Sequence, residues 1–89
     1  MLSLQILSPV LQDGKDTMRG IDRKEVGQRI RALRTDRGMR QVDLADRLGV
    51  TLNYVGRMES GIGMASIDLF QEIADLFDVT LDYLILGRL

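Results

Sequence analysis

The sequence predicts an all-α domain, because three kinds of helix signal coincide along it. Apolar residues recur at spacings of three and four, which places them on one face of a helix. Residues that cap helix starts precede most of these runs, and glycines that end helices follow most of them. The segments that carry these signals are 22–37, 41–48, 51–60, 66–77 and 80–86. Five short helices are therefore expected.

The first expected helix starts at Asp22 and ends at Gly38. Asp22, followed three residues later by Glu25, is a capping box that satisfies free amide groups at a helix start. Gly38 is a residue that ends helices readily. The inward face of this helix is Val26, Ile30 and Leu33.

The second expected helix runs from about Gln41 to Leu48 and ends at Gly49, and the third is capped by Thr51 and stops at Gly61. Their inward residues are Leu44, Ala45 and Leu48 in the second, and Val55 and Met58 in the third.

Ser66 caps the fourth expected helix, Thr80 caps the fifth, and Gly87 ends the fifth. The fourth is predicted to bury a stripe of Ile67, Phe70, Ile73, Ala74 and Phe77. The inward residues of the fifth are Leu81, Leu84 and Ile85.

Residues 1–20 differ from the rest and are assigned to an N-terminal tail or arm, whereas residues 21–89 form the helical domain. Leu2, Leu4 and Ile6 alternate with polar residues, a weak strand pattern that Pro9 interrupts. Two interpretations stay open, an extended or weakly β tail that is loosely attached, and an edge strand that forms a dimer.

The residue inventory argues against an enzyme. The chain has no histidine and no cysteine, so the commonest metal ligands and the commonest general base are missing. It has neither a phosphate-binding glycine loop nor a clustered carboxylate pair. No cofactor, metal or small-molecule ligand is expected. The apolar runs fall short of the roughly 20 residues that span a bilayer, so we expect a cytoplasmic protein with no membrane partner.

Charge is divided unevenly along the chain, although the net charge is only −1. Residues 19–57 hold ten basic and five acidic side chains, and residues 58–89 hold one basic and six acidic. This division can present a basic face to DNA phosphates. The alternative is that these charges lie on solvated helix faces.

Residues 41–59 have the pattern of two helices joined by a sharp turn. Ala45 is small where two helices would cross, and Gly49 can adopt the left-handed conformation that the turn needs. Val50 and Val55 fill the space between the helices. The second helix is then free to enter a major groove.

This segment, and the chain from Val26 to Gly87, resembles the lambda-repressor/Cro-like (Xre-type) helix-turn-helix family. The matching positions are 27–34, 37–38, 41, 44–45, 48–51, 59, 61 and 81–84. The resemblance implies a five-helix DNA-binding domain whose recognition helix spans residues 51–59.

The resemblance implies that outward side chains of that helix read bases of double-stranded DNA. These would be Leu52, Asn53 and Arg57. Arginine matches the two acceptors of guanine, asparagine matches adenine, and leucine offers only apolar contact, for example to a thymine methyl group. The alternative is that they are solvated side chains.

The resemblance further implies contacts to the DNA backbone from Arg40, Gln41, Thr51, Tyr54 and Gly56. Gln41 could instead cap its helix, and Tyr54 could pack between helices. Thr51 is also a helix cap. Arg40 occupies a position where the family usually has a small capping residue, and Gly56 either permits close approach to DNA or is simply tolerated.

Arg34 and Glu59 are implied to form an internal ion pair between the first helix and the end of the third. If the pair is buried, removing one partner should cost about 3–5 kcal/mol. Residues 61–65 depart from the family, which usually has a basic residue and a proline there, so weaker phosphate binding is expected.

The apolar C-terminus, with Leu84, Leu86 and Leu89, is the predicted dimer interface, unless these leucines pack within one subunit. The predicted function is a sequence-specific transcriptional regulator, a repressor that binds an inverted-repeat operator as a homodimer. The alternative is a protein-interaction module, antitoxin-like or an adaptor, that keeps the fold with weak or lost DNA binding. The basic-poor loop makes this alternative possible, whereas Gln41, Asn53 and Arg57 argue against it, because a pure interaction surface does not need such an outward polar set.

Overall fold

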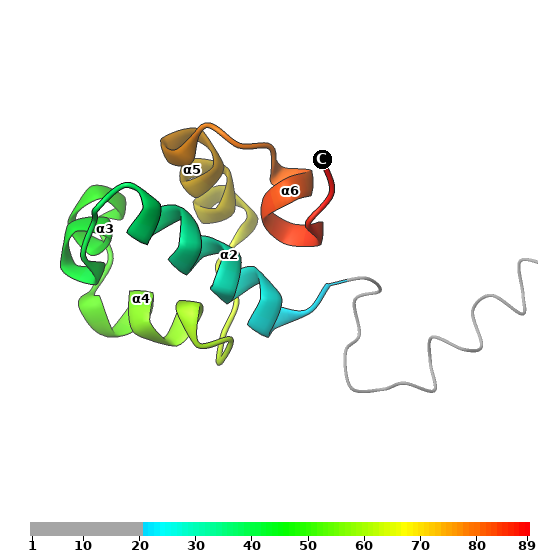
Figure 1. The fold of residues 1–89 in the computed structure, drawn as a ribbon. Coiled ribbons are helices and arrows are strands. Elements are labelled where there is room, and N and C mark those ends of the chain that lie inside the picture. The colour runs from blue at the N-terminus through cyan, green and yellow to red at the C-terminus, as the bar shows by residue number, and fades with distance from the viewer. Residues whose placement is uncertain (1–20) are drawn as a thin grey trace, which may run out of the picture.

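The computed structural model describes residues 21–89, which form five helices and no strand (Figure 1). The helices are α2 (Arg23–Asp36), α3 (Gln41–Leu48), α4 (Leu52–Glu59), α5 (Ile67–Phe77) and α6 (Leu81–Leu86). The all-α prediction is confirmed. The tail predicted for residues 1–20 lies outside the described residues.

Side chains cap four of the helix starts at the expected residues. The Asp22 carboxylate accepts hydrogen bonds from the backbone N–H groups of Lys24 and Glu25, at 2.9 and 3.3 Å. The hydroxyls of Thr51, Ser66 and Thr80 each accept the N–H three residues later, at 3.0, 3.2 and 3.0 Å. The Glu25 carboxylate lies 3.9 Å from an arginine one turn further on. These caps fix where the helices begin.

The ends of α3 and α5 show two ways of leaving a helix. Gly49 follows α3 with φ 71°, the left-handed conformation expected of a glycine at this turn. Asp78 ends α5 with φ 57°, although it has a side chain. Aspartate tolerates this conformation better than most residues, so a helix end without glycine is possible here.

One apolar core joins all five helices. Helix α4 packs against α2 and α3, α6 packs against α2 and α5, and α3 also contacts α5. Figure 1 shows α5 and α6 on one side of α2 and α4 on the other. The buried apolar residues are Val26, Ile30, Leu44, Ala45, Val55, Met58, Phe70, Ile73, Ala74, Phe77 and Leu84.

Two sequence-based predictions about burial are wrong. Ile67 was expected in the core but is 62% exposed, because it is the first residue of α5 and the apolar stripe reaches the core only one turn later. Leu84 was expected on the inward face of the fifth helix and also in a dimer interface. It is completely buried, so the inward position is confirmed and the interface role is wrong for this residue. It lies in the middle of α6, on the face that packs against α2 and α5.

Gly27 lets α2 approach the end of α4 very closely. A Cβ at Gly27 would lie 2.4 Å from the carbonyl oxygen of Glu59 and 2.6 Å from that of Met58. Backbone atoms cannot move aside as a side chain can, so only glycine fits this contact.

Arg29 of α2 and Arg37, the residue directly after it, fasten this helix to the ends of the C-terminal helices. Arg29 donates from Nε and Nη2 to the carbonyl oxygens of Leu84 and Ile85, at 2.9 and 2.8 Å. Arg37 donates to the carbonyl of Phe77 at 2.8 Å, and its guanidinium lies 5.1 Å from the centre of the Phe77 ring. Carbonyls at helix C-termini have no partner within the helix, so cations there are stabilising.

Across residues 21–89, none of the helices has the length and apolar character needed to cross a membrane.

Candidate nucleic-acid interface

Helix α4 divides into an inward and an outward face. Val55, Met58 and Glu59 are buried against α2 and α3. Leu52 is 51% exposed, and Asn53 and Arg57 are also exposed. Asn53 and Arg57 are four residues apart, so they lie on one side of the helix, one turn from each other. The expected base-reading residues are therefore free to contact a ligand.

The start of α4 is held by Thr51, whose hydroxyl is occupied as the cap that accepts the Tyr54 amide. Tyr54 is 37% exposed, so part of its side chain packs against the domain and part of it faces solvent. Together with Arg57, Met58, Gly63 and Met64, it lines an open pocket of about 210 Å³ between α4 and the following loop.

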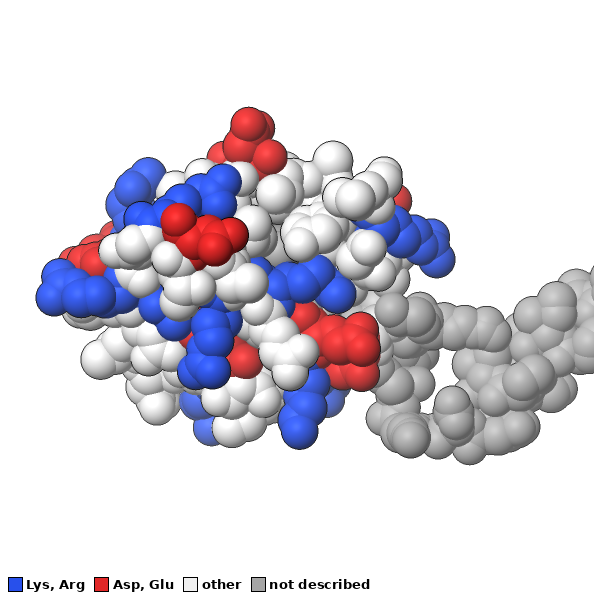
Figure 2. All heavy atoms as spheres, viewed as in Figure 1, with Lys and Arg blue, Asp and Glu red and all other residues white. Residues whose placement is uncertain are grey.

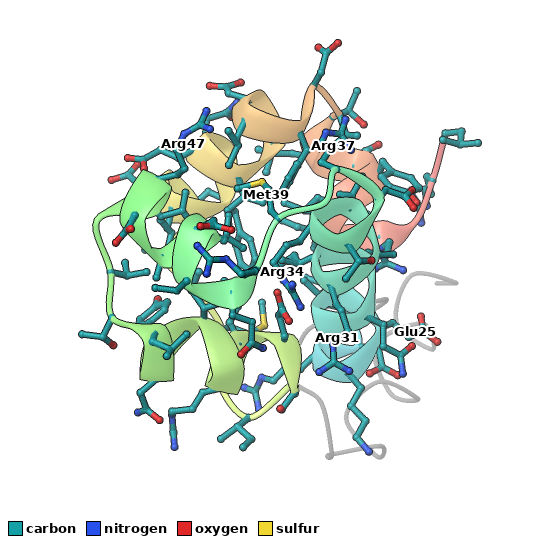
Figure 3. All side chains as sticks on the ribbon, turned by 60° about the vertical axis from the view of Figure 1, so that its left-hand side comes forward. Glu25, Arg31, Arg34, Arg37, Met39 and Arg47 are labelled. Carbon is teal, nitrogen blue, oxygen red and sulfur yellow. The ribbon has the colours of Figure 1, made fainter. Side chains whose placement is uncertain are left out.

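A buried carboxylate lies at the other end of α4. Glu59 accepts two hydrogen bonds from Arg34, at 2.7 and 2.9 Å, so the ion pair expected between these residues is present. Gln41 Nε2 donates to the same carboxylate at 3.0 Å, and Arg31 Nε lies 3.5 Å from it. Arg34 also donates to the carbonyl of Met39 at 2.8 Å. Figure 3 shows Arg34 in the middle of the domain, between α2 and α3. We call Arg31, Arg34, Gln41 and Glu59 the Glu59 cluster.

The contacts of the Glu59 cluster keep the carboxylate charged. Burial by itself raises the pKa of Glu59, but hydrogen bonds from Arg34 and Gln41 and the charges of Arg34 and Arg31 outweigh it, so the pKa is lowered. The same hydrogen bonding stabilises the charged form of Arg34, and the pKa of Arg34 is therefore raised. The polar atoms of the pair are satisfied, as a buried ion pair requires.

Gln41 has a role that the sequence did not suggest. Its amide does not cap α3 but bonds to Glu59, and the residue is half-buried. Because a carboxylate only accepts hydrogen bonds, it must face the amide nitrogen of Gln41. The side chain is thus held in one orientation, with its second N–H still available.

Arg40 precedes α3 and pairs with Asp43 instead of pointing freely into solvent. Its guanidinium donates to the Asp43 carboxylate at 2.9 and 3.0 Å, and the Arg40 amide donates to the same carboxylate at 2.8 Å. The pKa of Asp43 is lowered to about 2, mainly because its carboxylate accepts the side-chain hydrogen bonds from Arg40. The pair secures the start of α3 where a small capping residue is missing.

Gly56 is half-buried within α4, and a Cβ there would meet no atom within 4 Å. Packing inside the domain therefore does not require a glycine at this position. Any reason for it must lie in what approaches α4 from outside.

The basic residues of the N-terminal half serve two purposes. Arg34 is engaged with Glu59, as predicted, and Arg29 and Arg37 are engaged with the ends of α6 and α5. The contacts of Arg29 and Arg37 escaped prediction because their partners are distant in the sequence. Figure 2 shows basic side chains along the lower edge of the domain, the region of α4 in Figure 1, and also at its left and right, with acidic side chains among them and at the top. The exposed basic surface is thus smaller than the sequence count suggests.

The C-terminal leucines differ from one another. Leu84 is buried, as described, whereas Leu86 is half-buried and Leu89 is fully exposed. Leu86 and Leu89 are thus the two that a second molecule could contact.

Comparison with protein families matches residues 30–84 to the model of the helix-turn-helix family. A 52-residue segment is 42% identical to an HTH-type transcriptional regulatory protein of Pyrococcus furiosus, over 58% of this chain and 16% of that protein. YazB of Bacillus subtilis, an uncharacterized HTH-type transcriptional regulator, is 34% identical over 65% of this chain and 84% of its own length. The chain thus spans only a small part of the first relative.

Two solved structures share the fold. One is the restriction-modification controller protein C.AhdI of Aeromonas hydrophila, with a TM-score of 0.66 and 34% identity over 72% of this chain and 97% of C.AhdI. The other is SinR, the master regulator for biofilm formation, in complex with DNA. It has a TM-score of 0.61 and 28% identity over 66% of this chain and 95% of the SinR chain.

Proposed function

The chain belongs to the lambda-repressor-like (Xre-type) helix-turn-helix family of transcriptional regulators, and from that membership we propose that it is a sequence-specific repressor. It binds an inverted-repeat operator in double-stranded DNA as a homodimer and acts in the cytoplasm. Its activity is binding, and no catalytic step is proposed.

The outward face of α4 is the observation that carries this proposal. Asn53 and Arg57 project from one side of the helix without a partner among the residues that the structure describes. Each can form two hydrogen bonds with one base, Asn53 with adenine and Arg57 with guanine, and each pairing discriminates by about 1–3 kcal/mol. Leu52, exposed at the start of α4, offers apolar contact to a thymine methyl group.

Backbone contacts are proposed around the start of α4 and α3. The second N–H of Gln41 and a guanidinium N–H of Arg40 donate to phosphate oxygens, which only accept hydrogen bonds. The Tyr54 hydroxyl donates in the same way, and Thr51 and Gly56 allow close approach. SinR, which shares the fold, has been solved in complex with DNA, which supports DNA binding by a domain of this fold.

Dimer formation is proposed through Leu86 and Leu89. A single domain of this size reads few base pairs, and pairing places two recognition helices about one DNA turn apart. The exposed leucines at the C-terminus supply an apolar contact.

The experiment incubates purified protein with fragmented genomic DNA from its source organism, recovers the bound fragments and sequences them. A second sample uses the Asn53→Ala, Arg57→Ala double variant, whose exposed side chains do not support the core. We expect the wild type to enrich a short inverted repeat and the double variant not to enrich it.

If neither protein enriches any fragment at low salt, DNA reading is refuted. The protein-interaction alternative would then be favoured, since residues 61–65 contain no basic side chain. If both proteins enrich the same repeat, the protein reads DNA but not through Asn53 and Arg57.

A further inference from the structure

We infer that Lys24 and Arg31, two residues of α2, bind the DNA phosphates that border the C-terminal end of α4. This inference rests on the proposed DNA binding and adds a second phosphate-binding site to it. The site is built by a helix outside the helix-turn-helix itself.

A helix in the major groove has a phosphate backbone on each side, because the groove is only about 12 Å wide. The start of α4 has polar groups to meet one backbone, in the side chains of Thr51 and Tyr54. The loop after α4, residues 61–65, has no charged side chain at all. Positive charge for the second backbone must come from another element.

Helix α2 lies against this end of α4, as does Gln41 at the start of α3, and α2 brings basic side chains to it. The contact is made at Gly27, where a Cβ would lie 2.4 Å from the Glu59 carbonyl oxygen. Lys24 and Arg31 are three residues before and four residues after Gly27, so the three share one face of α2. The two basic residues therefore flank the contact.

Lys24 lies against the loop itself. A Cβ at Gly61 would come within 2.8 Å of the Lys24 Cα and 2.9 Å of its Cγ. The stem of the lysine thus starts directly beside the first loop residue, and Lys24 is exposed. A lysine ammonium on a flexible stem is well suited to contact a phosphate as a point charge.

Arg31 lies beside the last residue of α4. Its guanidinium approaches Glu59 with Nε, at 3.5 Å, and the side chain is 59% exposed. The contact is made by Nε, so the N–H groups of the two Nη atoms can donate to a phosphate. Glu59 is already neutralised by Arg34, at 2.7 Å, so Arg31 brings an additional positive charge to this edge. Figure 3 shows Arg31 on α2 at the level of α4, whereas Arg47 lies at the opposite, upper end of the domain.

The test measures how DNA affinity depends on salt. Fluorescence anisotropy of a labelled mixed-sequence duplex is recorded over a series of KCl concentrations for the wild type, Lys24→Gln, Arg31→Gln and Arg31→Lys. Arg47→Gln is the matched control, because it removes the same charge from an exposed arginine far from α4. Circular dichroism checks that each variant is folded.

The logarithm of the binding constant falls as the logarithm of the salt concentration rises, and each lost phosphate contact makes this negative slope shallower by about 0.9 per protomer. We expect this change for Lys24→Gln and Arg31→Gln, the wild-type slope for Arg47→Gln, and a slope near wild type for Arg31→Lys. The bases preferred in the genomic selection should stay the same.

Wild-type slopes for both folded glutamine variants would overturn the inference while leaving the proposed function intact. Absence of wild-type binding to the duplex and to genomic fragments would overturn both. Should Arg31→Gln fail to fold, the slope of Lys24→Gln decides the question, because its side chain is exposed and supports no part of the core.

Discussion

At the residue scale, the Glu59 carboxylate is the point at which the polar contacts of three helices meet. It binds Arg34 of α2 and Gln41 of α3, and it belongs to α4 itself. Loss of this group would leave the Arg34 guanidinium buried without a counter-charge. The cost of such a stranded charge exceeds the net value of the pair.

Glu59→Ala is therefore expected to lower the free energy of unfolding by about 3–5 kcal/mol, measured by urea denaturation. Asp43→Ala is the comparison, because it breaks the exposed pair with Arg40. It should cause a smaller loss, since exposed pairs are screened by water. Equal losses for the two variants would show that burial of the Glu59 cluster does not matter.

The lowered pKa of Glu59 also predicts how stability depends on pH. A carboxyl whose pKa is lower in the folded state than the usual 4.5 binds a proton more readily when unfolded. Its contribution is thus complete above that value and is lost as the pH falls toward the folded pKa. Urea unfolding of the wild type and Glu59→Gln across this acid range should show a weaker pH dependence in the variant. Identical pH profiles would contradict the prediction.

Gly27 and Gly56 form a matched pair of helical glycines with opposite surroundings. Gly27→Ala places a methyl group against backbone carbonyls and should destabilise the domain by about 1–3 kcal/mol or more. Gly56→Ala enters open space and should stabilise it by up to about 1 kcal/mol. Thermal unfolding tests both, and a stabilised Gly56→Ala with weaker DNA binding would place Gly56 at the DNA.

At the scale of helices, α6 depends on a contact from outside itself. It has only six residues, too few to be stable alone. Its last carbonyls are held by the Arg29 guanidinium, which also packs against the turn at Gly87. The position of α6 therefore depends on α2 as well as on α5.

Arg29→Gln is expected to loosen α6 more than any other helix. The shorter glutamine amide cannot donate to the carbonyls of both Leu84 and Ile85 as the guanidinium does. Hydrogen exchange followed by NMR should show lower protection of the amides of residues 84–87, with little change in α3 and α4. Uniform loss of protection over the whole domain would indicate that Arg29 supports global stability instead.

Helix boundaries were predictable from the sequence because their causes are local. Asp22, Thr51, Ser66 and Thr80 cap amides two or three residues away, and Gly49 turns the chain where it stands. The partners of Arg29 and Arg37 lie 55 and 40 residues away. Helical periodicity predicts which face of a helix a side chain lies on but not how far that part of the helix is from the core, and Ile67 was misplaced for this reason. Periodicity placed Leu84 inward correctly, and only its assignment to a dimer interface was wrong.

In the candidate site, too, features with local causes were predictable and features that depend on distant partners were not. The exposure of Leu52, Asn53 and Arg57 follows from helical spacing alone and was predicted. The bond between Gln41 and Glu59, and the position of Arg31 beside them, depend on how three helices pack. No local pattern encodes that arrangement, so only the structure reveals it.

At the scale of the whole molecule, the proposed homodimer depends on the exposed C-terminus. Replacing Leu86 and Leu89 together by serine should shift the protein from dimer to monomer in analytical ultracentrifugation. Its thermal stability should change little, because Leu89 is fully exposed and Leu86 half-exposed. Leu84→Ala, in contrast, opens a cavity in the core and should cost about 2–5 kcal/mol.

Two outcomes would contradict this prediction. A double serine variant that sediments as a dimer would place the interface elsewhere on the domain. A wild type that stays monomeric at high concentration, with and without DNA, would refute the homodimer itself.

The division of α4 into a buried and a free face also shapes how such a protein can evolve. Substitutions at exposed positions usually change stability by less than about 0.5 kcal/mol, and Leu52, Asn53 and Arg57 are exposed. A duplicated copy can therefore acquire a new target sequence by single mutations, without first accumulating stabilising changes elsewhere. Val55, Met58 and Glu59, on the buried face, are the positions at which the same lineage would stay constrained.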